Sequence, residues 1–270
     1  MKWAKCILAI FFAVLSLQLS LKFGHTFAVD SNDDFEVKKN SIVTQPPEIM
    51  LENIIVEDMK SLGSIVGSYK KNRYLTNLDT VYLKMPNQNV SVGDRFMIYN
   101  DLGGVKVPGS FMKKTGKNIS IKGFLQVSEV TPNTIVAKIY DSNIDINIGD
   151  LVAPISADIR VKLNPQEPTA NLTGMVLSAA KDVKFIGPYE FAFINKGSAD
   201  GLKKNDRLFV YRTGDGNQKV TKELPQVNIA ELIVANVSAH HATAYCTGSS
   251  ESFEEGSTFK TAKSEVRYLK

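Results

Sequence analysis

Asp94-Arg95-Phe96-Met97-Ile98-Tyr99 recurs further along the chain as Asp206-Arg207-Leu208-Phe209-Val210-Tyr211. Downstream of each copy, residues 123–153 align without gaps with residues 230–260, and six of the thirty-one pairs are identical. The identical pairs are Leu125 and Leu232, Val127 and Val234, Val130 and Val237, Ala137 and Ala244, Ser142 and Ser249, and Gly149 and Gly256. Most of them fall on alternating apolar positions and one is a turn glycine, which a shared β-fold would constrain first. The sequence therefore predicts two copies of one β-module.

Short apolar-rich runs separated by turn residues follow in the same order in both halves. The first half has runs at 64–69, 80–85, 95–99, 123–130, 134–140 and 151–154. The second half has runs at 175–179, 191–195, 207–212, 230–237, 242–247 and 258–260. Neither half contains a helical pattern long enough for a βαβ crossover. We therefore predict an all-β fold of two tandem small barrels or sandwiches.

Turn residues stand directly before two strands of the first module, as Gly93-Asp94 and Gly149-Asp150. Glycine supplies a positive φ there, and the aspartate can accept nearby backbone N–H groups. The second module has Asn205-Asp206 and Gly256-Ser257 at these sites, and asparagine also tolerates positive φ. We expect structural turns, not a charged site, at Gly93, Asp94, Gly149, Asp150, Asp206 and Gly256.

Residues 1–28 are typical of a secretory signal peptide. Lys2 and Lys5 precede an apolar run from Cys6 to Leu21, and small residues at Thr26 and Ala28 suit cleavage before Val29. A membrane anchor is the alternative, but spanning needs about 20 apolar residues and this run is shorter and interrupted. We therefore expect a periplasmic or secreted protein, cleaved near Ala28, with no transmembrane span.

Removal of residues 1–28 changes the charge and the cysteine content. Three lysines leave, so 32 basic residues become 29 against 28 acidic ones, and the formal charge falls from +4 to +1. A nearly neutral chain gives no electrostatic support for binding nucleic acid. Cys246 becomes the one remaining cysteine, so no disulfide can form within the mature chain. Stability must then come from burial of a core.

The remaining segments complete the predicted organisation. Residues 29–48 are polar and are interpreted as a disordered leader. Apolar residues at 3–4-residue spacing within 48–62 predict one short helix, although the β-branched run Ile54-Ile55-Val56 leaves a strand possible. The first module then covers 49–156 with this helix at its start, followed by a linker at 157–173, the second module at 174–262 and a tail at 263–270.

The order of these motifs resembles a known bacterial family. The clearest stretch runs from Asn195-Lys196-Gly197-Ser198-Ala199-Asp200-Gly201-Leu202 into the strand at 206–211. It is similar to the C-terminal β-module of flagellar assembly protein T and to the modules that follow LysM domains in envelope proteins. The resemblance implies an exported, non-enzymatic envelope component, peptidoglycan-associated or part of a ring around a rotary motor. No LysM repeat precedes residue 64, so direct glycan binding is not carried over.

His240, His241 and Cys246 are candidates for a metal site or a thiol nucleophile. In the repeat alignment the two histidines match a hairpin turn, and Cys246 matches Ile139 on the inward face of a strand. A buried thiol has a raised pKa and forms little thiolate, and a zinc site needs at least three suitably spaced ligands. The sequence therefore predicts a structural cysteine, with no metal, no cofactor and no catalytic residue.

A cluster of lysines lies in the first module, and no acidic residue occurs between Asp101 and Glu129. Pro108, Gly109 and Gly116 argue against extended regular structure, so we interpret the region as a long hairpin loop. Two interpretations stay open: a solvated loop, or a contact site for an anionic envelope polymer or lipid headgroup. The lysines are Lys106, Lys113, Lys114, Lys117 and Lys122.

These features favour an exported, non-catalytic cell-envelope protein that acts as a binding or assembly subunit. Its contacts with neighbours would use an edge strand or a loop. Envelope or flagellar proteins are the expected partners, peptidoglycan is a further candidate, and oligomerisation is compatible with a ring. Two alternatives stay open: a periplasmic module that binds an anionic polymer through the lysine cluster, and an unrecognised hydrolase.

Overall fold

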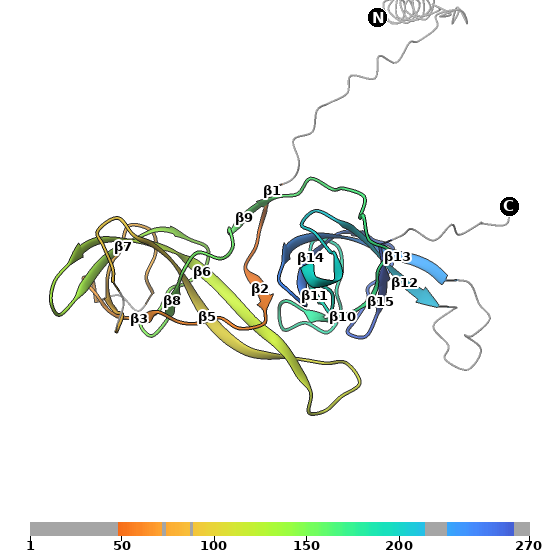
Figure 1. Ribbon diagram of the computed structural model, residues 1–270, viewed down its shortest axis with the longest axis horizontal. Coiled ribbons are helices and arrows are strands. Elements are labelled where there is room, and N and C mark those ends of the chain that lie inside the picture. Colours follow the sequence, from red (N-terminus) through yellow and green to blue (C-terminus); the bar gives the residue numbers. More distant parts are fainter. Residues whose placement is uncertain (1–47, 72–73, 87–88, 214–225, 262–270) are drawn as a thin grey trace, which may run out of the picture. The chain divides into compact units, whose positions relative to one another are not determined.

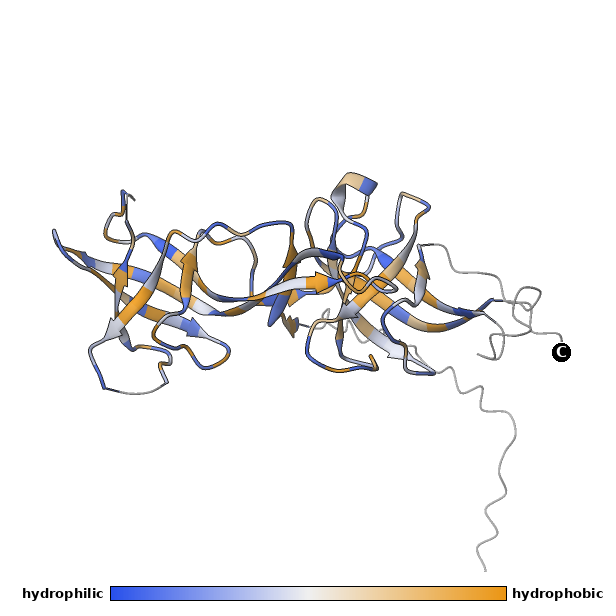
Figure 2. Ribbon diagram, turned by 90° about the horizontal axis from the view of Figure 1, so that it is seen from below, coloured by the Kyte–Doolittle hydropathy of each residue, from blue (hydrophilic) through white to orange (hydrophobic). Residues whose placement is uncertain are grey.

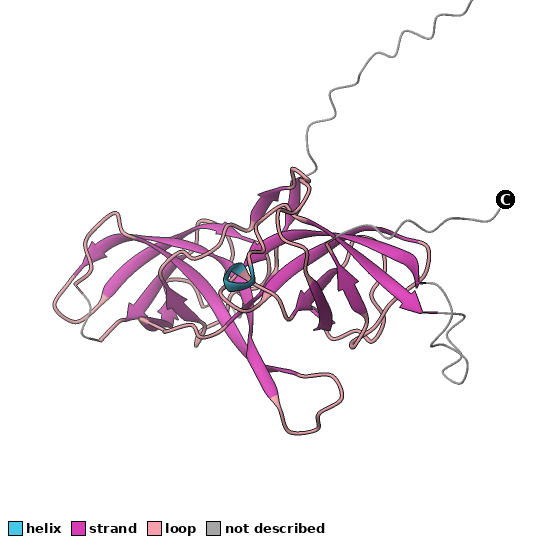
Figure 3. Ribbon diagram, turned by 45° about the vertical axis from the view of Figure 1, so that its right-hand side comes forward, coloured by secondary structure: helices cyan, strands magenta, loops and turns pink. Residues whose placement is uncertain are grey.

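The computed structural model describes residues 48–71, 74–86, 89–213 and 226–261, which belong to one compact unit. The predicted signal peptide, the leader up to residue 47 and the tail at 263–270 lie outside the described residues. Strands dominate, and the helical structure among these residues is the 3-10 turn Ser198–Asp200. The predicted all-β class is confirmed (Figure 3).

The two modules share one strand order (Figure 1). The first contains β3 (Gly63–Ser68), β4 (Thr80–Lys84), β5 (Arg95–Lys106), β6 (Lys114–Val130), β7 (Ile135–Ser142) and β8 (Leu151–Ala153). The second contains β10 (Thr173–Ala179), β11 (Phe191–Ile194), β12 (Arg207–Thr213), β13 (Gln226–Val237), β14 (Ala242–Ser249) and β15 (Thr258–Lys260). The second module is a closed barrel in the order β10-β11-β14-β13-β12-β15, and the first pairs its strands in the order β3-β4-β7-β6-β5-β8, with β8 returning to β3. Two halves with the same topology are what the sequence repeat predicts.

The irregularities of pairing also repeat. A register shift in β5 between Ile98 and Tyr99 recurs in β12 between Val210 and Tyr211. The two shifts in β6 recur in β13 at positions 107 residues further on, which is the spacing of the sequence alignment. A β-bulge bends a strand and increases its twist, which lets a small sheet close on itself. The two copies therefore use the same points of curvature to form their barrels.

The interior of each barrel is filled by matched apolar side chains. The first contains Ile65, Leu75, Val81, Leu83, Ile98, Leu125, Ala137, Ile139, Ile146 and Val152. The second has Val176, Ile186, Ala192, Ile194, Val210, Leu232, Ala244, Cys246, Phe253 and Phe259 at the same positions. Figure 2 shows these hydrophobic segments along the barrel strands. Cys246 thus takes the position that Ile139 has in the first barrel.

Each barrel contains three tight turns of one design. A residue with positive φ precedes a polar residue whose side chain accepts the backbone N–H three residues earlier, as Asp94 does from Ser91 (2.8 Å) and Asp206 from Lys203 (2.8 Å). The positive-φ residues are Leu78, Gly93 and Gly149 in the first barrel and Tyr189, Asn205 and Gly256 in the second. Gly93, Asp94, Gly149, Asp150, Asp206 and Gly256, which we expected in structural turns, lie in turns of this design, and the turns at Leu78 and Tyr189 are two more that the sequence did not indicate.

The predicted short helix within 48–62 is wrong. The chain forms β1 (Glu48–Met50) and β2 (Asn53–Val56) instead, and β2 pairs with β6, with Ile54 opposite Ile119. Ile54 and Ile55 are both buried although they point to opposite faces of the strand. A strand that is covered on both faces has no polar alternation, so its apolar spacing imitates a helix.

The predicted linker at 157–173 is more ordered than a simple connection. It contains β9 (Arg160–Lys162), which pairs with β1, and it buries Ile159, Val161 and Leu163. These side chains share an apolar cluster with Met97 of β5 and with Ile233 on the outer face of β13. The segment between the modules is therefore part of the packing that joins them.

Candidate functional site

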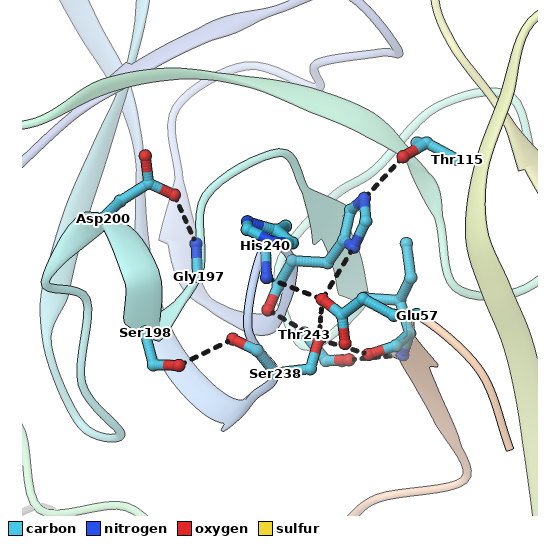
Figure 4. A network of polar contacts seen from close by, with 10 residues as sticks. Glu57, Thr115, Gly197, Ser198, Asp200, Ser238, His240 and Thr243 are labelled. Atoms are coloured by element: carbon cyan, nitrogen blue, oxygen red, sulfur yellow. Dashed lines mark hydrogen bonds and ion pairs between the residues drawn. The ribbon is translucent and has the colours of Figure 1, made fainter.

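The loop after β2 holds a hairpin turn of the second barrel through Glu57 (Figure 4). One carboxylate oxygen, Glu57 Oε1, accepts hydrogen bonds from Ser238 Oγ (3.2 Å) and the His240 N–H (2.6 Å), and it lies 3.3 Å from His241 Nδ1. The other ring nitrogen, His241 Nε2, lies 2.7 Å from the Thr115 hydroxyl of β6. The Glu57 carboxylate of the first module thus accepts hydrogen bonds from three groups of the turn between β13 and β14.

The contacts favour the charged form of the Glu57 carboxyl group. The Glu57 carboxylate can only accept, so His241 Nδ1 is the donor of their hydrogen bond, while the Thr115 hydroxyl can either donate to Nε2 or accept from it. Burial raises the pKa of the Glu57 carboxyl, but the hydrogen bonds from the His240 backbone, His241 and Ser238 outweigh it, so its pKa is lowered. The charged carboxylate is therefore the stable form in the folded chain.

The same junction is held by β2 itself. The Ile55 N–H donates to Thr243 Oγ1 (3.2 Å), and the Ile55 carbonyl accepts from Ser238 Oγ (3.3 Å). The Ile55 side chain packs with Val105 of the first module and with Phe193 of the second. These contacts join the two modules. They do not present reactive groups to a substrate, so we assign this network a structural role.

A groove of about 400 Å³ opens where β1 faces the second barrel. Its apolar lining includes Met50, Val183 and Tyr189, which are 42%, 46% and 73% exposed. Phe191 and Tyr245 form the wall with ring centroids 5.1 Å apart. Exposed aromatic and methionine side chains beside a concave wall are the features of a protein-binding surface.

The rim of this groove is acidic. Glu48, Glu52 and Glu190 line it together with Lys181. Lys181 is neutralised by Glu52, because its Nζ lies 2.7 Å from Glu52 Oε2. Glu48 and Glu190 therefore leave the groove with a net negative rim, which favours a partner with basic side chains.

One edge of β1 carries no strand among the described residues. Its pairing partner is β9, with Ile49 opposite Val161, and the next pair is joined by the bond from the Leu51 N–H to the Ile159 carbonyl (2.6 Å). Hydrogen-bonded and non-bonded pairs alternate in an antiparallel ladder. The backbone groups of Glu48 and Met50 therefore point away from β9, toward the open edge.

The predicted lysine loop does not exist as a loop, and its five lysines do not form one site. β5 continues to Lys106 and β6 begins at Lys114, so most of the segment is a long two-stranded arm. The glycines that argued against strands permit this arm: Gly116 has φ +55°, and a Cβ there would lie 2.8 Å from Ile55. Gly116 lets β6 pass closely over β2.

The lysines have separate environments. Lys122 is buried and its Nζ contacts both carboxylate oxygens of Asp150 at 2.9 Å. Lys117 lies 2.7 Å from Asp58 and 3.6 Å from Asp101. Lys106, Lys113 and Lys114 are exposed at the far end of the arm. Only these last three are free to contact an anionic surface as predicted.

Cys246 and the histidine pair lie where the alignment places them. Cys246 is fully buried, and burial raises the pKa of its thiol to about 11. His240 and His241 lie in the turn between β13 and β14. Among the described residues, no group of three or more His, Cys, Asp or Glu side chains is arranged to hold a metal ion.

The groove and the Glu57 contact are the site features that sequence reasoning missed. Both depend on residues 48–57, which were assigned to a helix and so carried no expected partner. The one available signal was the β-branched run of β2.

Comparison with known proteins identifies no relative. No protein-family model matches the chain, and no curated protein matches it. The similarity to flagellar assembly protein T and to LysM-associated modules therefore stays an expectation. In the part of the chain that the structure describes, no helix is long and apolar enough to cross a membrane.

Proposed function

We propose that this chain is an exported, non-catalytic cell-envelope protein that acts as a binding or assembly subunit. The observation that carries the proposal is the open edge of β1 beside the aromatic groove. An extended segment of a protein neighbour would add to β1 as a new strand and place alternate side chains in the groove. Flagellar or other envelope proteins are the proposed neighbours.

The groove specifies the chemistry of that segment. Main-chain hydrogen bonds to Glu48 and Met50 would hold it in register, whatever its sequence. An apolar side chain would pack on Phe191 and Tyr245, and a basic side chain next in line would meet Glu48 or Glu190. The contacts that Glu57 and Ile55 make across the junction support this function, because a groove whose walls are joined before binding loses less entropy when it binds.

The backbone part of the proposal is tested by Met50→Pro. Proline removes the N–H that faces the open edge, while the bonds to β9 come from Ile49 and Leu51 and are kept. Met50→Ala is the matched control, because it removes the same side chain and retains the N–H. With a photoreactive residue at Val183, we expect discrete protein adducts in intact cells that Met50→Pro abolishes and Met50→Ala only weakens.

A photoreactive residue at Val92, which is exposed on the first barrel, provides the background for this experiment. The same adducts at Val92 and Val183, or adducts indifferent to Met50→Pro, would contradict strand addition. Export is tested separately by N-terminal sequencing of the chain from the envelope fraction. A mature chain that begins at Val29 is expected, and an intact chain retained in the cytoplasm would refute this part.

The alternative of binding to an anionic polymer has one supporting observation. Lys106, Lys113 and Lys114 remain exposed together at the end of the β5–β6 arm. The other two lysines of the predicted cluster are occupied by acidic partners. Binding to an anionic polymer would therefore depend on these three lysines. Apolar residues adjoin them in the sequence, and a site for a charged polymer does not require such residues.

A further inference from the structure

The β5–β6 arm ends in a well-formed turn at residues 107–113 (Figure 3). The Val107 N–H donates to the Lys113 carbonyl (3.0 Å), and the Ser110 N–H donates to the Val107 carbonyl (3.1 Å). The Lys113 N–H in turn donates to Ser110 Oγ (3.3 Å). The backbone of the turn is therefore fixed by its own hydrogen bonds, and its side chains are held at the end of the arm.

Two large apolar side chains occupy the outermost positions of this turn. Phe111 is 107% exposed and Met112 is 95% exposed, the highest values among the large apolar residues that the structure describes. Neither contributes to an apolar cluster of the fold. Folding gains nothing from these residues here, and exposed apolar side chains favour association.

Cationic side chains surround the apolar pair. Lys106 and Lys114 are directly opposite each other across the arm, and Lys113 adjoins Met112. Like charges in opposed positions of a sheet destabilise it. Two acidic side chains of the second barrel, Asp182 and Glu255, line the groove that Lys106 also lines. Lys113 and Lys114 do not line that groove, and no salt bridge of the described residues includes either of them. The arm therefore ends in an apolar tip next to positive charge that no acidic partner among these residues neutralises.

We propose that this end of the arm, defined as residues 106–114, inserts into the interface of an anionic lipid bilayer. Phe111 and Met112 would enter the boundary between headgroups and acyl chains, and Lys106, Lys113 and Lys114 would lie among the anionic headgroups. A specific protein interface buries about 800 Å² on each partner, which two side chains on a narrow arm do not supply. A lipid interface requires no complementary pocket.

The inference extends the proposed function and does not rest on the β1 groove. It uses a different surface, and its test needs only purified chain and lipid. The probes are vesicles of phosphatidylcholine alone and vesicles with half of that lipid replaced by phosphatidylglycerol. The chain is taken from the envelope after export, and every variant has the same N-terminus, so residues 1–28 cannot account for a difference.

We expect binding to the anionic vesicles, little binding to the neutral ones, and weaker binding as salt is raised. Phe111→Ser with Met112→Ser should lower the partition coefficient at least about tenfold. Lys113→Glu with Lys114→Glu should lower it by about fivefold per lysine or more. Phe185→Ser is the matched control, because Phe185 is an exposed phenylalanine of the second barrel. Its replacement should leave the partition coefficient unchanged.

Three results would overturn the inference. They are failure of the unmodified chain to bind anionic vesicles, binding that the Phe111 and Met112 substitutions leave unchanged, and equal effects of the Phe185 control. Loss of binding with the lysine variants alone would assign the surface to an anionic polymer. A photoreactive residue at position 111 that captures one protein in cells, without vesicle binding, would assign it to a protein. Adducts at the β1 groove report on the proposed function separately.

Discussion

Glu57 and His241 lie 184 residues apart in sequence, yet their side chains meet at 3.3 Å and join the two barrels. The carboxylate satisfies the His240 N–H and the Ser238 hydroxyl as well, so one acidic side chain serves three donors of a neighbouring turn. A donor left without its acceptor at a partly buried position costs more than an ordinary hydrogen bond contributes. The pair therefore controls how firmly the modules are held together.

Replacement of Glu57 by alanine should lower the free energy of unfolding by about 1–3 kcal/mol, because the His240 N–H and His241 Nδ1 lose their acceptor, whereas Ser238 Oγ keeps the Ile55 carbonyl. Glu57→Gln should cost less, since its amide oxygen still accepts. Urea titration at neutral pH measures both. Asp58→Asn is the control, because the adjacent Asp58 side chain is 74% exposed and pairs with Lys117 instead of the turn between β13 and β14. An equal loss from Asp58→Asn would show that the carboxylate network contributes nothing.

The same residue should make the chain sensitive to acid. The folded state lowers the pKa of Glu57, so the stabilisation is complete above the unfolded carboxyl pKa of about 4.3 and is lost as pH falls through the lower folded value. The unmodified chain should therefore lose stability below about pH 5 more steeply than Glu57→Gln. Parallel curves of unfolding free energy against pH for the two chains would contradict this.

The buried pair Lys122–Asp150 offers a test of the duplication itself. Its side chains are only 9% and 8% exposed, and the second barrel has Ile229 and Ser257 at the corresponding positions. Lys122→Ile alone should cost about 3 kcal/mol or more, because it leaves Asp150 charged and buried. The double variant Lys122→Ile with Asp150→Ser should recover most of this loss.

The recovery has a structural reason. Ser257 Oγ already accepts the Glu254 N–H at 3.2 Å, as Asp150 Oδ2 accepts the Asn147 N–H at 2.7 Å. Serine therefore keeps the turn after the ion pair is removed. Chemical denaturation of the two single variants and the double variant gives the coupling energy. Additive losses would show that the two barrels do not have interchangeable cores.

The repeat predicted the barrels well because strand order, turns and inward positions are local properties that both copies show. Cys246 was assigned to the core because Ile139 occupies the matching position in the other copy, and it is buried there. The turn at Asn205 was expected because glycine precedes the aspartate of the first copy, and its φ is +74°. A duplicated sequence shows each position of the fold twice. A position with the same type of residue in both copies is therefore explained by the shared fold.

The junction between the modules could not be predicted in the same way. Its segments occur once in the chain, so the repeat offers no second copy with which to compare them. Ile54 and Ile55 are buried in two different apolar clusters, which removes the alternation that identifies a strand. The lysines looked like one cluster because Asp58 and Asp150, which pair with Lys117 and Lys122, are distant in sequence. Contacts between remote segments depend on the tertiary fold, and no pattern of spacing along the chain encodes them.

At glycines with a positive φ and open space around the Cα, replacement by alanine should lower the stability of the fold through backbone strain alone. At Gly93 and Gly149 an added Cβ would meet nothing within 4 Å, yet φ is +98° and +101°. Alanine at either site should cost about 1–2 kcal/mol. Gly248→Ala is the matched control, because Gly248 is also open within 4 Å and lacks a positive φ, so its change should be neutral or slightly stabilising. Thermal unfolding of the three variants distinguishes strain from crowding.

The thiol of Cys246 should be unreactive toward alkylating reagents in the folded chain. Alkylation requires a solvent-accessible thiolate, and burial both covers the sulfur and raises its pKa to about 11. At pH 8 iodoacetamide should therefore modify Cys246 only as fast as the barrel opens, and at once in denaturant. A Phe111→Cys variant supplies an exposed thiol as the control and should react rapidly without denaturant.

The raised pKa also fixes the sign of the alkaline response. The folded state favours the neutral thiol, so its stability advantage is full below the unfolded thiol pKa of about 8.5 and is lost as pH rises from there toward 11. Cys246→Ala should remove this part of the alkaline loss while it lowers stability at pH 7 through the cavity it leaves. Rapid alkylation of the native thiol at pH 8 would require a reactive cysteine and would reopen the catalytic alternative.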